Sequence, residues 1–452
     1  MWHWRSQPLA ARTGSEIFAK LFQNEAIATL LESPYPTPKA FPQLTRFSIC
    51  AGRPKGEILT PELGEILPTL RGLLDEKPTP NTEVEHLPFN GGYLGWLGYD
   101  LAWEIESLPS KNRDELPFPV AYWYQPASFA VLDHQNQILW LAAMNSKSLD
   151  ELEEQLQQPN ISIPDSTKQK TFPLEFLSDR QAYTSAVTQA KKYIQAGDIF
   201  QTNLSLRFHT QTETCGWDIY QKLHEINPSP FASYWRSPWG EMISCSPERL
   251  VKKTDNLVET RPIGGTRPRG QTPAEDKALG QELSSNIKER AEHTMLVDLE
   301  RNDLGRACKW GTVEVDEQFI LEHYSHVIHL VSNVKGQLDP AQDEADLIRA
   351  MFPGGTITGC PKVRCMEIIE ELEPVRRSLF YGSCGYLDQR GNLDLNILIR
   401  TLLLVPNEGD RPADVYGQVG AGIVADSEPE KEWFESLQKA KAQLQALQLI
   451  DP

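Results

Sequence analysis

The sequence lacks the features of a membrane or secreted protein. It contains no run approaching the roughly 20 apolar residues that a membrane-spanning helix needs. Its first residues, Met1 to Arg5, include no apolar core of the signal-peptide kind. The seven cysteines are scattered and odd in number, and no two form a Cys-x-x-Cys pair. Because secreted domains use paired cysteines, this pattern favours reduced thiols, and we expect a cytoplasmic protein.

Basic residues are scarce relative to acidic ones. There are 44 lysines and arginines against 62 aspartates and glutamates, which gives a formal net charge of −18. Nucleic acids and anionic membranes are bound through basic patches, so the composition argues against both partners. If the substrate is an anion, its site must be locally positive.

The composition is otherwise that of an ordinary globular protein. The chain has 452 residues, of which 40% are apolar and 23% charged, so it can bury a large core. A polar stretch rich in Gln, Glu and Asp suggests a linker near the end of the first third. We therefore predict an N-terminal segment over 1–145, a linker over 146–177 and a C-terminal domain over 178–450.

Periodicity in the second half predicts both strands and helices. A helix begins at a capping box of Ser178 and Gln181 and stops at Gly197. Further helices are expected at about 216–226, 271–300, 343–351, 361–373 and 428–449. Strands are expected at about 231–236, 241–251, 325–334, 380–388, 395–405 and 414–424. Because the two types do not alternate strictly, we predict an α+β fold with a largely antiparallel sheet or sandwich.

One predicted strand has two distinct faces. Phe200, Thr202, Leu204, Leu206 and Phe208 point one way, and Gln201, Asn203, Ser205 and Arg207 point the other. A polar strand face beside a core suggests a lined cavity. A solvated sheet face is the alternative explanation.

Two helices carry the same pair of acids. Ser427 and Glu430 predict a capping box for a helix that presents Glu432 and Glu435 one turn apart. A helical segment from about 286 to 299 presents Glu289 and Glu292 in the same way. Two such faces can supply the few carboxylates that Mg2+ takes from a protein, leaving room for water and substrate. The structural alternative is a helix-surface ion pair between Glu435 and Lys439.

Three histidines, His323, His326 and His329, are three residues apart. They lie in a β-branched segment, where His326 and His329 would point to opposite faces, so the pattern does not favour a zinc site. A single His329 facing a cavity would suit acid–base chemistry near neutral pH. A packed or surface histidine is the alternative.

A glycine-rich loop, Phe352 to Arg364, leads into a predicted helix. Its backbone N–H groups, the hydroxyls of Thr356 and Thr358 and the nearby charge of Lys362 suggest an anion site. A plain turn and helix cap would explain it equally well. Glycines at 262–269 and a turn at Gly420–Gly422 also allow the backbone to approach a carboxylate, and Arg400 can pair with one.

Several ordered motifs resemble one known family. They are Ala196–Gln201, Asn227–Phe231, Ser246–Arg249, Arg290–His293, Val297–Gly305, Phe352–Arg364 and Ile399–Thr401. They are similar to the chorismate-utilising enzymes that include anthranilate synthase component I and aminodeoxychorismate synthase component I. The resemblance runs from about Leu30 to the C-terminus. It implies a large four-layer α/β/β/α sandwich of mostly antiparallel sheets, with the N-terminal segment packed into it and the chorismate-binding domain over 178–450.

The resemblance also implies roles for individual residues. Mg2+ would be held by Glu292 and Glu435 with support from Glu289 and Glu432, and Glu248 and His329 would serve in acid–base steps. Substrate would be bound by Thr266 and Thr358, by Tyr386 and Arg400 at the enolpyruvyl carboxylate, and by Gly420, Ala421, Gly422 and Lys439 at the ring carboxylate.

The reaction itself depends on one position. Many aminodeoxychorismate synthases resemble each other in a Pro-Ile-Lys-Gly-Thr motif whose lysine adds to chorismate, and anthranilate synthases typically carry alanine there. This chain has Gly264. The loop at 354–359 and the run from Asp394 are more similar to the aminodeoxychorismate branch, so we expect formation of 4-amino-4-deoxychorismate, in the p-aminobenzoate and folate branch. Anthranilate synthase is the alternative. Isochorismate or salicylate formation and a non-catalytic chorismate-binding regulator are less favoured.

The resemblance implies two further partners. Ser33 and the run Asn227, Pro228, Ser229, Pro230 and Phe231 are similar to parts of a tryptophan pocket. Both kinds of synthase receive ammonia from a glutamine amidotransferase subunit, and no such domain is visible in this chain.

Overall fold

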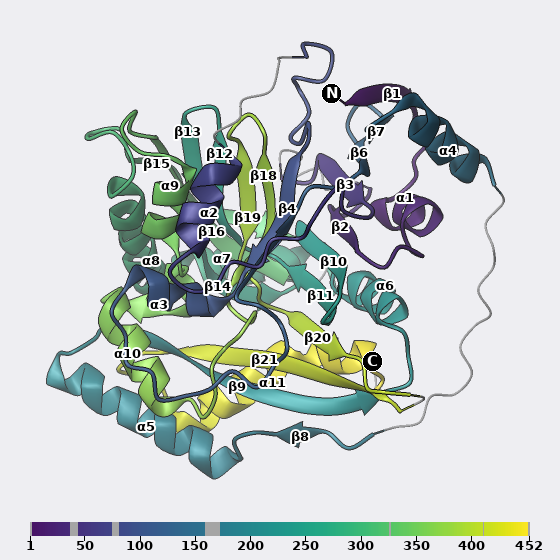
Figure 1. Cartoon of the computed structure of the whole chain (residues 1–452). Helices are drawn as coiled ribbons and strands as arrows, with labels where there is room; N and C mark the ends of the chain where they lie inside the picture. The colour runs from purple at the N-terminus through teal and green to yellow at the C-terminus, as the bar shows by residue number, and fades with distance from the viewer. Residues whose placement is uncertain are drawn as a thin grey trace.

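The structure is a computed structural model that describes residues 2–36, 44–74, 81–158, 172–324, 327–409 and 411–450. Over these residues it is built from two antiparallel sheets with helices on their outer faces (Figure 1). The helices are α1 Gly14–Leu21, α2 Ile66–Leu73, α3 Ala102–Ile105, α4 Ser146–Gln157, α5 Arg180–Ala196, α6 Gly216–Ile226, α7 Pro273–Ser285, α8 Ile287–Gly305, α9 Glu344–Met351, α10 Lys362–Leu372 and α11 Pro429–Ala446, with short 3-10 turns η1 Tyr99–Leu101 and η2 Gly355–Ile357.

The larger sheet has twelve strands in the order β1-β7-β6-β3-β2-β10-β11-β20-β21-β9-β17, with β8 beside β9. They are β1 His3–Pro8, β2 Ala28–Glu32, β3 Phe47–Ala51, β6 Ser128–Asp133, β7 Ile138–Ala143, β8 Glu175–Phe176, β9 Gln201–Thr212, β10 Phe231–Ser237, β11 Gly240–Ser246, β17 Gly359–Cys360, β20 Thr401–Val405 and β21 Ala413–Ile423. The smaller sheet has nine strands in the order β14-β16-β13-β12-β19-β18-β4-β5, with β15 beside β16. They are β4 Gly92–Leu97, β5 Ala121–Tyr124, β12 Arg249–Thr254, β13 Leu257–Thr260, β14 Ile263–Pro268, β15 Glu314–His323, β16 Val327–Gln337, β18 Ser383–Asp388 and β19 Leu393–Asn396.

The apolar residues of the two sheets form the core between them. Trp235 and Met242 of the larger sheet and Trp96 and Leu395 of the smaller one belong to a single buried cluster. A second cluster lies between the outer face of the larger sheet and helices α1, α4, α6 and α11, and α7, α8 and α9 pack on the smaller sheet. The predicted four-layer α/β/β/α arrangement is therefore confirmed.

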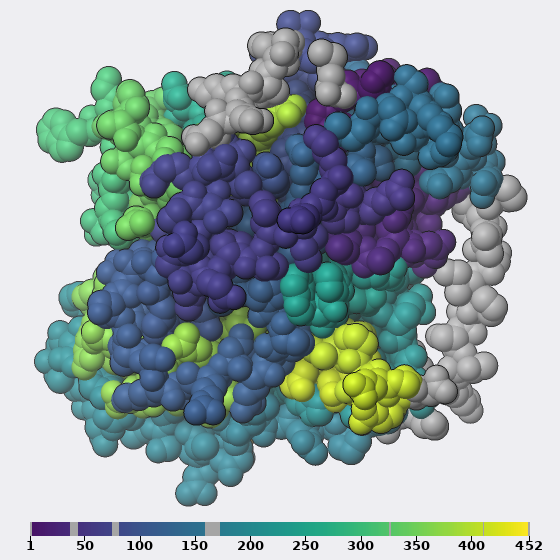
Figure 2. All heavy atoms as spheres, viewed as in Figure 1, coloured from purple at the N-terminus to yellow at the C-terminus, as the bar shows by residue number. Residues whose placement is uncertain are grey.

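The N-terminal segment contributes strands to both sheets. In the larger sheet β2 pairs with β10, with Leu31 opposite Ser233, and in the smaller one β4 pairs with β18, with Leu94 opposite Tyr386. Figure 2 shows this segment, in purple and blue, lying directly against teal and green parts of the chain over much of the visible face. Within the predicted linker, α4 packs through buried Leu149, Leu152 and Leu156, and 159–171 fall outside the described residues.

Two predicted helix caps are each wrong by one residue. Helix α5 is capped by Asp179 in place of Ser178, and its carboxylate accepts a hydrogen bond from the Ala182 N–H at 2.7 Å. Helix α11 follows Glu428, which makes no side-chain cap. The Ser427 hydroxyl instead accepts from the Val424 N–H at 3.1 Å and stabilises the turn before the helix.

Three other sequence predictions need correction. The helix expected over 271–300 is two helices, because Asn286 leaves helical geometry and caps α8. The strand expected over 395–405 is broken at Arg400, whose φ is 51°. Phe200 lies before β9 and is 67% exposed, so it does not belong to the apolar strand face. His326 lies outside the described residues.

Candidate active site

Three side chains from distant parts of the sequence, Glu248, His329 and Arg400, meet in the interior. Glu248 lies in the turn between β11 and β12, His329 on β16, and Arg400 just before β20. Burial has the largest effect on the pKa of both Glu248 and His329, and the positive charge of Arg400 also acts on both, so Arg400 lies within electrostatic reach of each of them. Nη1 of Arg400 also donates a hydrogen bond to Asn227 Oδ1 at 3.1 Å.

Glu248 is a buried carboxyl group. Burial raises its pKa to about 7, against the lowering effect of the Ile263 N–H, the Thr356 hydroxyl and Arg400. The Ile263 N–H donates to Oε1 over 3.4 Å. Glu248 can therefore carry or release a proton near neutral pH, which acid–base chemistry requires.

His329 is a buried neutral imidazole. Its Nδ1 lies 2.8 Å from the hydroxyl oxygen of Thr266, the residue directly opposite it on β14. Its Nε2 is buried and has no hydrogen-bond partner among the described residues. Burial and Arg400 lower its pKa to about 3. His329 can thus bind a polar atom of a ligand through Nε2 without bringing a charge.

One predicted glutamate of α8 lies within electrostatic reach of one on α11. The charge of Glu435 on α11 raises the pKa of Glu292 on α8, after the larger effect of burial. Each also has a cationic neighbour on its own helix, since Lys439 lies 3.0 Å from Glu435 and Lys288 lies 3.5 Å from Glu292.

The first glutamate of each pair, Glu289 on α8 and Glu432 on α11, contacts another group of the protein. Arg267 donates to Glu289 at 2.9 Å. Glu432 is buried, and the Ser427 hydroxyl opposes the rise that burial causes in the pKa of its carboxyl. Both are thus oriented by the protein.

A hard divalent cation fits the chemistry of these donors. In the described part of the chain, no three His, Cys, Asp or Glu side chains already converge as a metal cluster. Mg2+ needs fewer, because it binds through one or two carboxylates and keeps several waters or substrate oxygens. Glu292 and Glu435 offer that pair, and a cation between them would offset their mutual repulsion.

The glycines at 420–422 lie within β21, whereas a turn was predicted. Strand β9 pairs with β21 along its whole length, but β20 pairs only with residues 414–417. The Gly420 carbonyl oxygen accepts a hydrogen bond from Lys439 Nζ at 2.9 Å, so this carbonyl points away from β9. Because alternate residues of a strand point to the same edge, the N–H groups of Gly420 and Gly422 face the side that β20 leaves open. This edge can donate to an anion.

The glycine-rich loop differs from the predicted anion site. The Thr358 hydroxyl donates to the Gly354 carbonyl within the loop at 2.8 Å. Lys362 donates to the buried carboxylate of Asp303 at 2.6 Å, and Arg364 to Asp198 at 2.9 Å. These cations are therefore neutralised by acids of this chain, and the loop acts on Glu248 through Thr356.

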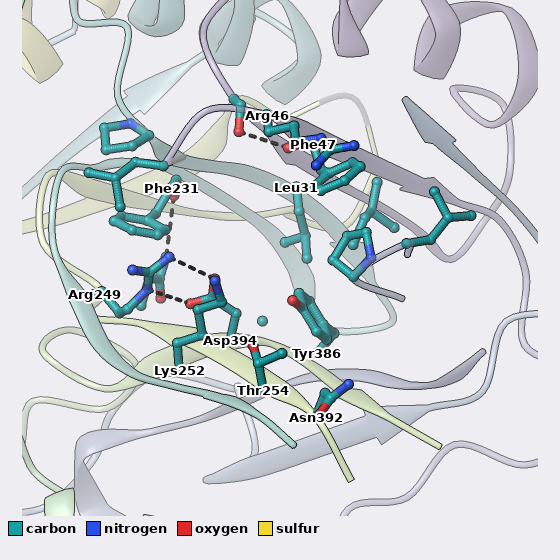
Figure 3. A pocket seen from close by; sticks show the side chains of 18 of the residues that line it. Leu31, Arg46, Phe47, Phe231, Arg249, Lys252, Thr254, Tyr386, Asn392 and Asp394 are labelled. Carbon is teal, nitrogen blue, oxygen red and sulfur yellow. Dashed lines mark hydrogen bonds and ion pairs between the residues drawn. The ribbon is translucent and has the colours of Figure 1, made fainter. Parts of the chain in front are cut away.

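A cavity of about 420 Å³ lies between the sheets near β2 and β18, and we call it the second cavity because Glu248, His329 and Arg400 do not line it. Ser33, Pro230 and Phe231 line it as predicted, and Figure 3 shows Leu31, Phe231 and Tyr386 around one hollow. Asn227, Pro228 and Ser229 are not among its lining residues, and the first of these binds Arg400 instead.

Tyr386, predicted to bind the enolpyruvyl carboxylate together with Arg400, belongs to this cavity. Burial, followed by Asp394 and Asp388, raises the pKa of its hydroxyl, while Arg249 and Arg390 oppose the rise. The expected joint action of Tyr386 and Arg400 on one carboxylate has no support in these contacts. Tyr381, which sequence reasoning passed over, donates its N–H to the Leu398 carbonyl, two residues before Arg400, at 2.9 Å.

Sequence reasoning also missed two buried polar residues of α8, His293 and Glu300. His293 Nε2 lies 2.7 Å from the Ser332 hydroxyl oxygen, and burial raises the pKa of Glu300 to about 8. Both share a buried stripe with Leu296, Val297 and Leu304. The spacing of three and four residues was the available signal.

Comparisons with known proteins show the family of this chain. The model of the chorismate binding enzyme family matches residues 50–445. The chain belongs to the chorismate binding enzymes. It is 61% identical to the anthranilate synthase component I-like protein of Synechocystis sp. over 99% of this chain and 92% of that protein. It is 45% identical to aminodeoxychorismate synthase component 1 of Bacillus subtilis over 82% and 81%, and 42% identical to anthranilate synthase component 1 of Thermus thermophilus over 84% and 83%.

Solved structures of chorismate binding enzymes share the fold. Anthranilate synthase component I of Streptococcus pneumoniae superposes with a TM-score of 0.77 at 31% identity, covering 88% of this chain and 92% of that one. The menaquinone-specific isochorismate synthase of Escherichia coli, at 17% identity, has a TM-score of 0.74 and covers 99% and 95%. In this chorismate binding enzyme, no described helix has the length and apolar content to span a membrane.

Proposed function

We propose that this chain is the synthase component of an anthranilate synthase. It converts chorismate and ammonia into anthranilate, pyruvate and water. Ammonia adds at C2 of the ring, the C4 hydroxyl leaves, and the enolpyruvyl group is then eliminated as pyruvate. This departs from the aminodeoxychorismate reaction expected from the sequence. The 61% identical relative supports the change, since it is named as like anthranilate synthase component I.

The proposal depends mainly on the environment of Gly264. A Cβ on this residue would lie 2.5 Å from Nδ1 and 2.9 Å from Cβ of His293. The buried ring therefore occupies the space where a lysine side chain would begin. The absence of a lysine amine at this position supports direct addition of ammonia, as in the anthranilate reaction.

The remaining residues then have definite tasks. Lys439 and the N–H groups of Gly420 and Gly422 bind the ring carboxylate, and Arg400 binds the carboxylate of the enolpyruvyl group. Glu248, with a pKa of about 7, donates and accepts the protons, and His329 binds a polar substrate atom through Nε2. Glu292 and Glu435, supported by Glu289 and Glu432, would hold Mg2+, which when bound assists loss of the C4 hydroxyl as a Lewis acid.

A separate glutamine amidotransferase subunit supplies the ammonia in this proposal. The designation component 1, carried by the Bacillus and Thermus relatives, supports it.

Formation of 4-amino-4-deoxychorismate is the second candidate. The 45% identical Bacillus relative, which is named for that reaction, favours it. The same chorismate-binding residues would serve, but the enolpyruvyl group would be retained.

One incubation separates the two candidates. The purified chain is mixed with chorismate, Mg2+ and ammonium at mildly alkaline pH, and the products are identified by mass while pyruvate is assayed. Anthranilate with stoichiometric pyruvate supports the proposal. An aminated product that keeps its enolpyruvyl group, without pyruvate, overturns it in favour of the second candidate.

We further infer that the second cavity binds tryptophan. Apolar side chains of Leu31, Phe231 and Tyr386 can enclose an indole ring, and polar groups such as Ser33 lie at the same cavity. Titration calorimetry with tryptophan should show saturable binding, weakened at least about tenfold by Phe231→Ala, because buried aromatic contacts dominate such affinities. Phe200→Ala, a change at an exposed phenylalanine outside the cavity, is the matched control. Equal affinity in both variants would refute this site.

A further inference from the structure

Glu300 is a buried acid for which the proposed reaction has no direct use. It lies on α8 and is only 3% exposed. Three charged groups act on it: Asp303 one turn along α8, Lys362 on α10, and Glu248 in the turn after β11. Lys362 is itself paired with Asp303 at 2.6 Å.

Glu300 contacts the glycine-rich loop. Its Oε1 accepts a hydrogen bond from the Gly355 N–H at 3.3 Å. A Cβ on Gly355 would lie 2.5 Å from Leu299 Cδ2 and 3.1 Å from Glu300 Oε1. Glycine therefore lets the loop backbone lie this close to α8 without displacing the side chain of Leu299.

The contacts of Glu300 lead back to Glu248 by two routes. Gly355 is followed by Thr356, whose buried hydroxyl makes no hydrogen bond with the described residues but lies close enough to Glu248 to lower the pKa of its carboxyl. Thr260 Oγ1 lies 3.5 Å from Glu300 Oε2 and donates to the carbonyl of Leu250, two residues after Glu248, at 2.9 Å. Glu300 thus lies behind the site, between two segments that shape the surroundings of Glu248.

The protonation state of Glu300 is compatible with a position close to Glu248. Burial, then Asp303, raises its pKa to about 8, and Glu248 acts in the same direction, while Lys362 and the Gly355 N–H oppose the rise. At neutral pH the carboxyl is mostly protonated. It can then accept from Gly355 without setting a second negative charge beside Glu248.

We propose that Glu300 is a positioning residue that holds the loop 353–358 against α8 and, through Gly355 and Thr356, fixes the surroundings of Glu248. This inference rests on the proposed function for its kinetic consequence. The placement of the loop does not depend on the proposed function and can be measured separately.

Three variants of the full-length chain test it: Glu300→Ala, Glu300→Gln and Asp298→Asn. Glutamine keeps an oxygen that accepts from Gly355, and alanine does not. Asp298 is an exposed acid on the same helix and serves as control. For each variant, kcat and KM for chorismate are measured with ammonium, and hydrogen exchange is followed in the peptide that contains residues 353–358.

Glu300→Ala should lower kcat roughly 10- to 100-fold with little change in KM, because a displaced catalytic group costs about that much. Exchange should accelerate in the loop peptide but not in the strands of the larger sheet. Glu300→Gln should restore most of both properties, and Asp298→Asn should match the original chain. The inference is overturned if Glu300→Ala leaves loop exchange unchanged, if exchange rises throughout the molecule, or if glutamine does no better than alanine. Should the original chain not consume chorismate, the proposed function fails, and the exchange comparison alone decides the inference.

Discussion

Nδ1 of His329 lies 2.8 Å from Oγ1 of Thr266, across the pair formed by β14 and β16. This bond uses one ring nitrogen and fixes the plane of the imidazole. The other nitrogen, Nε2, remains for a ligand. Because the ring stays neutral, the hydroxyl and Nδ1 share a single proton, and their bond determines whether Nε2 donates or accepts.

Removing this hydroxyl should impair the reaction. Thr266→Val leaves a buried ring nitrogen without its partner, which costs about 1–3 kcal/mol of stability. We expect kcat to fall roughly tenfold or more, because the ring is no longer held in its productive orientation. Steady-state kinetics with chorismate and ammonium measure this. Thr266→Ser keeps the hydroxyl and should retain most of the activity, and equal losses in both variants would contradict the role of this bond.

Glu248 should make folding stability depend on pH. Its pKa rises from the ordinary value of 4.5 to about 7 in the folded chain, so the folded state holds its proton more tightly than the unfolded state. The stability that this provides is present below about pH 4.5 and is lost as the pH rises through 7. The full loss is about 3 kcal/mol.

Glu248→Gln removes this dependence. The free energy of unfolding is measured by urea unfolding at pH 5 and at pH 8. The value for the variant minus the value for the original chain should be larger at pH 8 than at pH 5. Glu430→Gln, at an exposed ion pair with Arg180, should show no such gain. A stability difference that is the same at both pH values would show that Glu248 does not hold its proton in the folded chain.

Turnover should require a divalent cation bound by the glutamates of α8 and α11. Chelation with EDTA should abolish the conversion of chorismate, and added Mg2+ should restore it. Glu435→Gln should raise the Mg2+ concentration needed for half-maximal rate by roughly tenfold or more, since Mg2+ takes few protein carboxylates. Glu430→Gln lies on the same helix and should leave that concentration unchanged. Full activity of Glu435→Gln at low Mg2+ would refute the metal assignment.

A side chain at position 264 should destabilise the protein. Gly264→Ala forces its new methyl group against His293, and overpacking of this kind costs about 1–3 kcal/mol. Gly305→Ala introduces the same group at the end of α8, where a Cβ meets no atom within 4 Å. Thermal unfolding should show a lower midpoint for the first variant only. Equal midpoints would mean that His293 moves aside freely.

The sequence predicted local structure well where apolar residues repeat with one period over several helical turns. Helix α6 covers the predicted range 216–226, since its apolar residues repeat every three to four positions. The acids of α8 and α11 were recognised for the same reason. Capping residues were less certain, because several neighbouring side chains can accept from the same N–H groups.

Features that depend on long-range pairing could not be predicted in the same way. The break at Arg400 arises where the chain passes from β19 in one sheet to β20 in the other. The side of the fold that Tyr386 faces depends on its register with Leu94 and Asp394, which lie far away in the sequence or across a turn. The spacing of the buried residues of α8 could signal that Glu300 is buried, but it could not reveal its partner, which is a backbone N–H of a loop.

The strand pairing between β4 and β18 also has a consequence for how the chain is made. Gly92 cannot find its partner until Asp388 has been synthesised and has left the ribosome. The edge of β4 therefore stays open through most of translation, and such unpaired edges favour aggregation. Production of this protein should gain more from slower synthesis or chaperone supply than from changes that stabilise the finished fold.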